Sequence, residues 1–482
     1  MCEEPLSDKA RRYRLAGICV AFACTGCGAQ PATSSGVAGA ANAGALAGLI
    51  AVDTTCGLTI DDACPGDPAT DAHCGLEEAV LVVRDRRSEY GCEWPEDTDH
   101  GLTISVPNQG VFLVGGTLHL ENAVLIRSAV AGSLATIRGR EEHDLFGVEP
   151  MLPVSVSFED LHLIGAGRGL QTQATGIAIS GETPERGATV NVTRCWIEQF
   201  SNGAIVATDV NLNVSDSTLA DNNNDYGDGG GGIFYDTNGD AASQVDFMTV
   251  SSSSIVRNHS TKGAGIHIQS SSITRITNST IADNVTDGGH GGGISFANNA
   301  GPLADGVLRI VGSTIAFNGS TTFAGAGIAV GANRDLFVDN VNNQVYLAGS
   351  IVANNCLGQV TAGGTFACLT PSDYSGELFG LQDSVLGSRA SAVLVGPDQG
   401  GLGSSGTVLQ DVDAGLDPEL TDQGGVGGHH PPVHSLRPAS PAIDAAAVLA
   451  TPNAFDQTHR PRGVARSGAR QPGFDLGAVE AQ

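Results

Sequence analysis

Lysine and aromatic residues are scarce in this chain. Of its 482 residues only two are Lys, 5% are aromatic and 16% are charged. So few aromatic residues argue against a large aromatic-packed core and favour a narrow core of aliphatic side chains. Asp and Glu total 52 against 24 Lys and Arg, which gives a formal charge of −28 at pH 7. This charge repels phosphate backbones, so we predict no nucleic-acid partner.

No hydrophobic run is long enough to span a bilayer. The apolar stretch from Leu15 to Cys24 follows a basic segment and ends at Thr25-Gly26-Cys27. This pattern resembles a bacterial lipobox, so residues 1–27 are predicted to be a signal peptide with Cys27 as the lipidated residue and membrane anchor. Cys24 stands where a lipobox usually has Leu, so ordinary signal cleavage nearby remains the alternative. Residues 28–50, rich in Ala, Gly and Ser, are predicted to form a tether.

The chain instead has an internal repeat. A small residue followed by Ile recurs six times, at intervals of 28, 28, 33, 28 and 34 residues, at Ile177, Ile205, Ile233, Ile266, Ile294 and Ile328. A second track runs out of phase with the first and carries Ser-Thr-Ile-Ala-Asp-Asn or a close variant, starting at Ser217, Ser253, Ser279, Ser313 and Gly349. Short β-branched motifs separated by Gly, Asn and Asp predict two strands in each repeat.

Repeats of this kind predict an all-β protein, a single right-handed parallel β-helix of the pectin-lyase-like type over residues 101–415, with short N-terminal and C-terminal caps. Its first coil should use residues 102–106, 111–114 and 117–120. Asn258, Asn284 and Asn318 should stack in one row and bond along it, which gives them a structural role. A monomer is expected. The alternative is a β-sandwich, in which the six isoleucines would not form a single row.

Seven cysteines lie beyond the predicted signal. Export permits disulfides, and the candidates are Cys56, Cys64, Cys74 and Cys92 near the N-terminus and Cys356 and Cys368 on a late coil. The first four contain no C-x-x-C pair, which argues against zinc. Cys195 is left over, and its place in the repeat predicts a buried thiol.

Residues 51–100 include the run from Cys74 to Val80. This run resembles the CSLREA domain found at the N-terminus of exported bacterial β-helix proteins, and it matches at Cys74, Leu76, Glu78 and Ala79. Gly75 replaces Ser and Glu77 replaces Arg. Apolar residues also fall on one face of a short helix that would cover the open end of the first coil, namely Leu76, Ala79, Val80 and Val83.

Residues 416–482 carry four motifs in order, namely Asp417-Pro418-Glu419-Leu420, the run from His434 to Ala445, Asp456-Gln457 with Arg460-Pro461-Arg462-Gly463, and the run from Phe474 to Glu480. They resemble the choice-of-anchor Q domain. This resemblance implies a C-terminal end for the β-helix, and we expect an ion-paired cap over the last coil made by Asp444, Asp456, Arg460, Arg462 and Asp475. Both resemblances imply an exported protein of the bacterial outer membrane or cell surface with no assigned chemistry.

Ionisable side chains gather in the loops that follow the second track. We expect Asp225, Asp228, His259, Lys262, Asp287 and His290 to share one surface, because their offset from the asparagine row is similar. Glycines at 229–232 and 291–293 would let a ligand approach the backbone. The competing interpretation is that Asp, Asn and Gly are simply turn residues.

Two classes of function follow. The first is a non-enzymatic surface protein that binds a polysaccharide or another cell-surface ligand, weakly and with no cofactor, although calcium is compatible with the acidic loops. The second is a polysaccharide lyase or glycoside hydrolase acting on acidic glycans. A complete set of acid, base and cation ligands is not evident in the sequence, so no catalytic residue is assigned.

Overall fold

A computed structural model describes residues 48–52, 74–88, 92–95, 101–139, 143–149, 154–167, 173–181, 188–225, 229–237, 247–269, 273–297, 306–331, 343–361, 365–378, 380–382, 384–386, 389–394, 408–410, 413–421, 431–443, 445, 455–462 and 475–479. Cys27, Cys56, Cys64, Asp228 and Asp444 lie outside these residues, so their predicted roles stay predictions.

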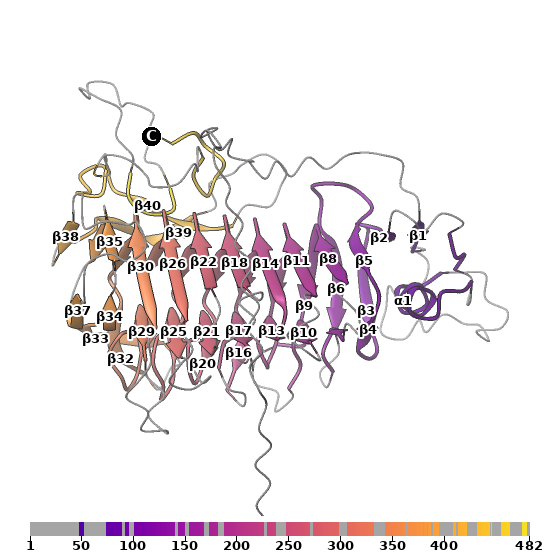
Figure 1. The fold of residues 1–482 in the computed structure, drawn as a ribbon, viewed down its shortest axis with the longest axis horizontal. Helices are drawn as coiled ribbons and strands as arrows, with labels where there is room; N and C mark the ends of the chain where they lie inside the picture. The colour runs from indigo at the N-terminus through magenta and orange to yellow at the C-terminus, as the bar shows by residue number, and fades with distance from the viewer. Residues whose placement is uncertain are drawn as a thin grey trace, which may run out of the picture. The chain divides into compact units, whose positions relative to one another are not determined.

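Three long parallel sheets run along the stack of coils (Figure 1). Sheet A contains β1 (Leu49–Ala51), β2 (Leu102–Val106), β5 (Val124–Ser128), β8 (Ser155–Glu159), β11 (Thr189–Thr193), β14 (Asn211–Ser215), β18 (Phe247–Ser251), β22 (Ile273–Thr277), β26 (Val307–Val311), β30 (Gln344–Ala348) and β35 (Gly380–Gln382). Sheet B contains β3 (Val111–Val114), β6 (Ala135–Gly139), β9 (Leu161–Ile164), β12 (Trp196–Glu198), β15 (Thr218–Ala220), β19 (Ser254–Val256), β23 (Thr280–Ala282), β27 (Thr314–Ala316), β31 (Ile351–Ala353), β36 (Ser384–Leu386) and β38 (Val408–Gln410).

Sheet C supplies the third wall. It contains β4 (Leu118–Leu120), β7 (Phe146–Val148), β10 (Ile177–Ser180), β13 (Ile205–Thr208), β17 (Ile233–Asp236), β21 (Ile266–Gln269), β25 (Ile294–Ala297), β29 (Ile328–Val330), β34 (Tyr374–Leu378) and β37 (Arg389–Leu394). Each of its ten strands belongs to one coil, and each coil also supplies one strand to sheets A and B. The chain is therefore a parallel β-helix, and the predicted first-coil strands are confirmed.

The six isoleucines of the first track form one row in sheet C. Each pairs in register with the next, from Ile177 with Ile205 through to Ile294 with Ile328. All six are completely buried, because successive residues of a strand point to opposite faces and these point inward. The sandwich alternative is therefore wrong.

The asparagine row of the second track is also confirmed. In it, Asn258 donates from its backbone N and its Nδ2 to Oδ1 of Asn284, both at 3.0 Å. Asn284 makes the same two bonds to Asn318, and its Nδ2 also donates to the carbonyl of Ile255 at 2.8 Å. The side chains are buried, so these bonds satisfy polar groups that water does not reach.

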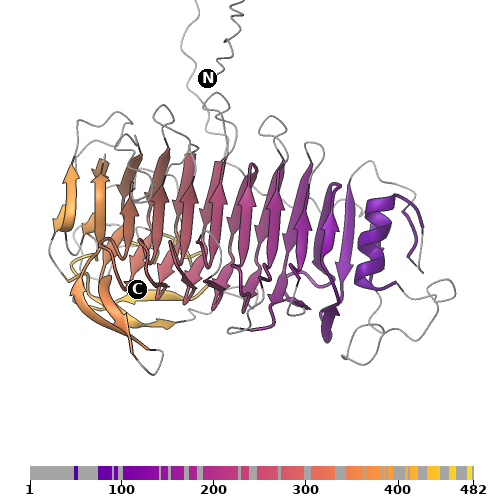
Figure 2. The ribbon, with the colours of Figure 1, turned by 90° about the horizontal axis from the view of Figure 1, so that it is seen from below.

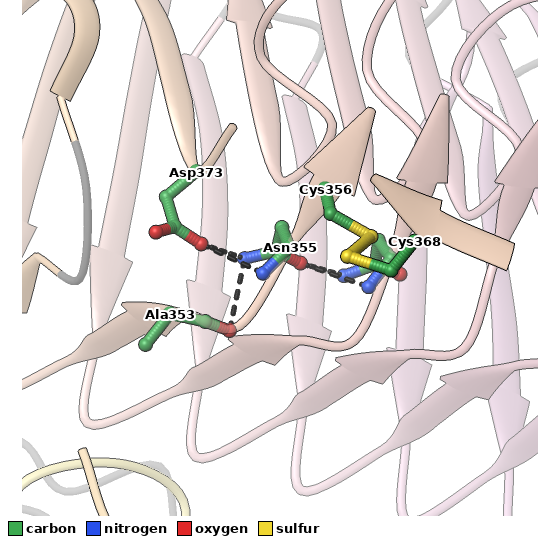
Figure 3. The surroundings of a disulfide bond; sticks show 6 residues. Ala353, Asn355, Cys356, Cys368 and Asp373 are labelled. Atoms are coloured by element: carbon green, nitrogen blue, oxygen red, sulfur yellow. Dashed lines mark hydrogen bonds between the residues drawn. A yellow bond between two sulfur atoms is a disulfide. The ribbon is translucent and has the colours of Figure 1, made fainter. Parts of the chain in front are cut away.

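One alignment in this track is wrong by one residue. The fifth motif begins at Ser350, which is the hydroxyl partner of Ser313, and not at Gly349. The ladder residue of that coil is Asn355, and it donates to Asp373, which ends the ladder (Figure 3). Asn354 takes the left-handed turn conformation (φ 61°) that Phe317 takes in the coil before.

A short helix covers the first coil, as predicted. The helix α1 (Leu76–Asp85) lies at the N-terminal end of the stack (Figure 2), and its buried side chains include all four predicted apolar residues. The disulfide Cys74–Cys92 fixes its start.

The strand β1 was not predicted. It pairs with β2 and extends sheet A into residues that were assigned to the tether and the N-terminal cap. No helix in the described part of the chain is long and apolar enough to cross a membrane.

A disulfide hairpin projects from a late coil. The short sheet D contains β16 (Asn223–Asn224), β20 (His259–Ser260), β24 (Val285–Thr286), β28 (Gly319–Ser320), β32 (Cys356–Val360) and β33 (Phe366–Pro371). Strand β33 returns antiparallel to β32, and Cys356 and Cys368 join the two strands as predicted (Figure 3). The ring of Phe366 packs over Gly319 of the previous coil, where a Cβ atom would lie only 2.5 Å from the ring.

The described residues of the C-terminal segment lie along the side of the coils and not over the last one. Its described residues 413–421, 431–443, 445, 455–462 and 475–479, here called the strap, include the antiparallel pair β39 (Leu416–Thr421) and β40 (Val433–Leu436). Gln457 bonds to Ser254 and Thr280 on the outer face of sheet B, at 2.8 and 2.7 Å. Further along, the backbone N of Ala478 donates to Thr314. The predicted position over the last coil is therefore wrong for these residues (Figure 1).

The strap covers a row of small side chains. Ala220, Val256 and Ala282 lie on successive strands of sheet B and pack against Leu420. The small residues give a flat surface on which the strap can lie closely.

Arg462 binds the strap to the coils through hydrogen bonds. Its guanidinium donates to the carbonyls of Gly312, Gly477 and Asp475 and to Oδ1 of Asn278. The predicted ion pairing of Arg462 stays a prediction.

Cys195 is a buried free thiol, as predicted. It occupies the position that serine holds in later coils, because its backbone N donates to Oγ of Ser217 at 3.0 Å. Burial raises the pKa of its thiol to about 12.

Because the thiolate is the reactive form, we expect Cys195 to resist a disulfide reagent such as DTNB in the native protein. It should react once denaturant unfolds the chain. Rapid reaction of Cys195 itself in the native protein, located by mass spectrometry of the labelled peptide, would contradict this.

Candidate functional site

The ionisable loops lie beside sheet D. Its strands pair in register, so Asn223, His259, Val285 and Gly319 follow one another on successive coils. In β16, β20 and β24 the second residue of each strand points inward and is buried, whereas the first is partly exposed. His259 therefore stands on the outer face and Ser260 on the inner face, as the two-residue period of a strand requires.

Asp225 and His259 form the best-defined contact of the predicted surface. Nδ1 of His259 lies 2.8 Å from Oδ1 of Asp225 and 3.1 Å from Oδ1 of Asn223. Nδ2 of Asn223 in turn donates to Asp225 at 2.7 Å. The side chains of His259 and Asp225 are 28% and 41% exposed, so water reaches this pair. The arrangement orients the imidazole through Nδ1 and leaves Nε2 as the nitrogen available to a ligand.

Asp287 and His290 have different neighbours from those of Asp225. Oδ1 of Asp287 accepts a hydrogen bond from Oγ1 of Thr321 at 3.0 Å, and the same hydroxyl accepts from the backbone N of Gly288. The ring of His290 stacks on Phe323, with centroids 4.1 Å apart and an angle of 20° between the planes. These contacts tie each coil to the next one along the stack.

Lys262 lies in the loop after β20. Its carbonyl accepts hydrogen bonds from the backbone N of Gly230 and from the Ser260 hydroxyl. The structure thus joins Asp225 to His259, Asp287 to Thr321 and His290 to Phe323, on consecutive coils. The binding role of this surface stays a prediction.

The glycines of these loops serve coil stacking. A Cβ atom at Gly231 would lie 2.5 Å from the carbonyl oxygen of His259, and one at Gly293 would lie 2.6 Å from that of Gly327. Both positions therefore need glycine because neighbouring coils approach closely. Gly288 alone among the glycines of the second and third loops, 263–265 and 288–293, has open space at its Cβ position. The expected approach of a ligand to glycines 229–232 and 291–293 is therefore not supported.

A metal centre is not evident in the described residues. No group of three or more His, Cys, Asp or Glu side chains among them is arranged to hold a metal ion. Calcium at the acidic loops stays a prediction, because Asp228 lies outside these residues.

Sequence reasoning missed the buried His267. This residue lies on β21, is 1% exposed, and its Nε2 accepts a hydrogen bond from Nε2 of Gln269 at 2.9 Å. Burial, with a smaller effect of the Lys262 charge, lowers its pKa to about 3. His267 is therefore neutral at physiological pH and belongs to the packing of sheet C. Nothing in the sequence indicated that His267 is buried, because it is a single His within a repeat motif.

Two histidines of the strap lie near aspartates of the coils. Nε2 of His434 lies 3.7 Å from Asp283, whose pKa burial raises to about 6, and burial lowers the pKa of His434 itself. His459 lies 2.9 Å from Asp216, and the hydrogen bond to this carboxylate raises the pKa of His459. Neither contact was predicted, because each joins residues far apart in the sequence.

Comparison with known proteins gives little further guidance. No protein family model matches the chain, and no curated protein matches it. Among solved structures it is similar to the Dettilon tailspike protein (gp208), with 12% sequence identity and a TM-score of 0.26. The match covers 71% of this chain and 66% of the tailspike chain. The assignment of fold rests on the strand pairing, and the resemblances to the CSLREA and choice-of-anchor Q families stay predictions.

Proposed function

We propose that the protein is a non-enzymatic β-helix displayed outside the cell, where it binds a polysaccharide across several coils. The observation that carries this proposal is the pairing of its ionisable loop residues with neighbours on the next coil. Asp225 holds His259, and Asp287 is bonded to Thr321. Groups fixed in this way form a rigid polar surface that repeats along the stack, which suits an extended ligand of repeating units.

Two observations support display outside the cell. The structure contains the disulfides Cys74–Cys92 and Cys356–Cys368, and such bonds persist in oxidising compartments. The N-terminal segment ending at Cys27 resembles a lipoprotein signal, and a lipid there would anchor the protein.

The test is affinity electrophoresis in gels that contain soluble polysaccharides, with and without calcium. We expect weak retardation of the wild type and about a tenfold loss of affinity when His259→Ala is combined with Asp287→Ala, because both side chains face the ligand in the proposal. Asp221→Asn is the matched control, since Asp221 pairs with Arg257 at a different turn. Unchanged retardation of the double variant would show that these loops are only turns.

A catalytic role is the second candidate, and the Asp225–His259 contact favours it. A carboxylate bonded to Nδ1 of an imidazole prepares Nε2 to take up a proton. Incubation with uronic-acid polymers and calcium tests this role. We expect no product, whereas turnover that is lost in His259→Asn would replace the binding proposal with a lyase or hydrolase.

A further inference from the structure

Two arginines lie side by side on the outer face of sheet A. Arg275 on β22 and Arg309 on β26 are register partners. Both lie between buried neighbours in their strands, Arg275 is exposed, and Arg309 is partly exposed. Adjacent strands are about 4.8 Å apart, so the two guanidinium groups leave the sheet side by side.

This arrangement has no counterion among the described residues. Neither Arg275 nor Arg309 makes an ion pair there. Like charges opposite each other in a sheet are destabilising. The chain has 52 acidic residues, and it does pair other arginines across coils, as Arg257 with Asp221 at 2.8 Å shows. Within the described residues, no carboxylate therefore compensates this positive pair.

The next residue in the row holds one of these arginines in place. Tyr346 on β30 is the register partner of Arg309, and the guanidinium carbon of Arg309 lies 5.6 Å from the centre of its ring. The Tyr346 hydroxyl donates to Oε1 of Gln344 at 2.8 Å, which fixes the ring. Nε of Arg309 is buried without a hydrogen-bond partner, and Arg309 as a whole is partly exposed. The stacking on Tyr346 reduces the entropy lost when an anion binds the guanidinium.

The same row continues with neutral polar side chains. Going towards the N-terminus from Arg275, the register partners on the outer face are Thr249, Asn213, Asn191 and Ser157. Nδ2 of Asn213 donates to Oδ1 of Asn191, and Nδ2 of Asn191 donates to Oγ of Ser157, both at 3.1 Å. Hydroxyl and amide groups of this kind match the hydroxyls of sugars, and they repeat once per coil.

We propose that this row of sheet A binds a linear anionic polysaccharide, with Arg275 and Arg309 holding a carboxylate or sulfate group. The proposal rests on the polysaccharide-binding function above and adds a site on another sheet together with the charge of the ligand. Guanidinium groups bind such oxyanions through paired hydrogen bonds. The negative charge elsewhere on the protein disfavours binding of the polymer outside this row.

The experiment measures affinity for polygalacturonate, dextran sulfate and uncharged dextran in the presence of a calcium chelator, using the full-length protein. We expect Arg275→Gln combined with Arg309→Gln to weaken binding of the anionic polymers about tenfold or more. The two anionic polymers show whether carboxylate or sulfate is preferred. Arg84→Gln combined with Arg257→Gln removes the same charge elsewhere and should leave affinity nearly unchanged.

Each outcome has a separate meaning. If both double variants lose the same affinity for the anionic polymers, the effect comes from the net charge of the protein, and the site is overturned. Binding that persists in Arg275→Gln with Arg309→Gln, or a wild type that binds dextran alone, would also overturn it while leaving the proposed function intact. A wild type that binds no polysaccharide at all would overturn both the proposed function and the sheet A site. Thermal unfolding of each variant confirms that it is folded.

Discussion

Replacing Asn284 with alanine is expected to lower the free energy of unfolding by roughly 3–5 kcal/mol, one of the largest effects of any single substitution in this chain. The side chain is completely buried. Its Nδ2 donates to Ile255 and Asn318, and its Oδ1 accepts two hydrogen bonds from Asn258. Alanine removes all four bonds and takes the Oδ1 acceptor away from the buried backbone N of Asn258, whereas Nδ2 of Asn258 keeps the Leu219 carbonyl and Oδ1 of Asn318 keeps the backbone N of residue 284.

Denaturant unfolding of Asn284→Ala, compared with Asn213→Ala, measures this effect. Asn213 is partly exposed on the outer face of β14, so its replacement should cost less than about 1 kcal/mol. Because each coil contacts only its neighbours, hydrogen exchange should also increase first in the coils on either side of residue 284. Similar losses in the two variants would mean that the asparagine row does not stabilise the fold.

Acid is expected to destabilise the protein through His267. Its pKa in the folded chain is about 3, well below the ordinary value of 6.5, so folding favours the neutral ring. This contribution to stability is complete above pH 6.5 and is lost as the pH falls from 6.5 towards 3. Each pKa unit corresponds to about 1.4 kcal/mol, so the loss amounts to several kcal/mol. Protonation would also break the bond from Gln269, because the protonated Nε2 can no longer accept it.

The variant His267→Phe separates this effect from other titrations. The position accepts a ring, because its register partner in the preceding coil is Phe234. We expect the variant to lose some stability at pH 7 but to gain on the wild type between pH 6.5 and 3. Asp283, whose raised pKa of about 6 stabilises the fold on acidification, is present in both proteins and cancels in the difference. His119→Asn is the control, since half of the His119 side chain is exposed. Parallel stability curves for wild type and His267→Phe would contradict the assignment.

The spacing of the motifs predicted the coils because every coil needs an apolar side chain at the same core position and an asparagine at the same turn. Ile281 must fill the core between Ile255 and Ile315, and Asn284 must satisfy the turn beside it. The fifth repeat was misaligned by one residue because Ile351 and Val352 are both β-branched. Either can fill the core position, and the strand register with the bonds from Ser313 to Ser350 and from Asn318 to Asn355 decides between them.

The strap and the arginine pair could not be predicted in the same way. Gln457 reaches Ser254 across 203 residues of sequence, and no periodic pattern marks where an irregular segment will pack. Arg275 and Arg309 are 34 residues apart, with a longer connection between their strands than in the coil before, so their register was not evident. Asp225 and His259 follow their ladder asparagines by three residues and by one, and they meet because His259 is the register partner of Asn223, two residues before Asp225.

The asparagine row also gives the stack a direction. Each asparagine donates an Nδ2 hydrogen to the amide oxygen on the next coil and also donates from Nδ2 to a backbone carbonyl of the preceding coil, and the last one donates to Asp373. A carboxylate can accept these hydrogens but has none to pass on. Coils carrying Asn258, Asn284 or Asn318 are therefore interchangeable, and a gene could gain or lose one of them without breaking the chain of bonds. The coil that carries Asp373 could not be repeated in this way, because its carboxylate donates no hydrogen bond to a following coil.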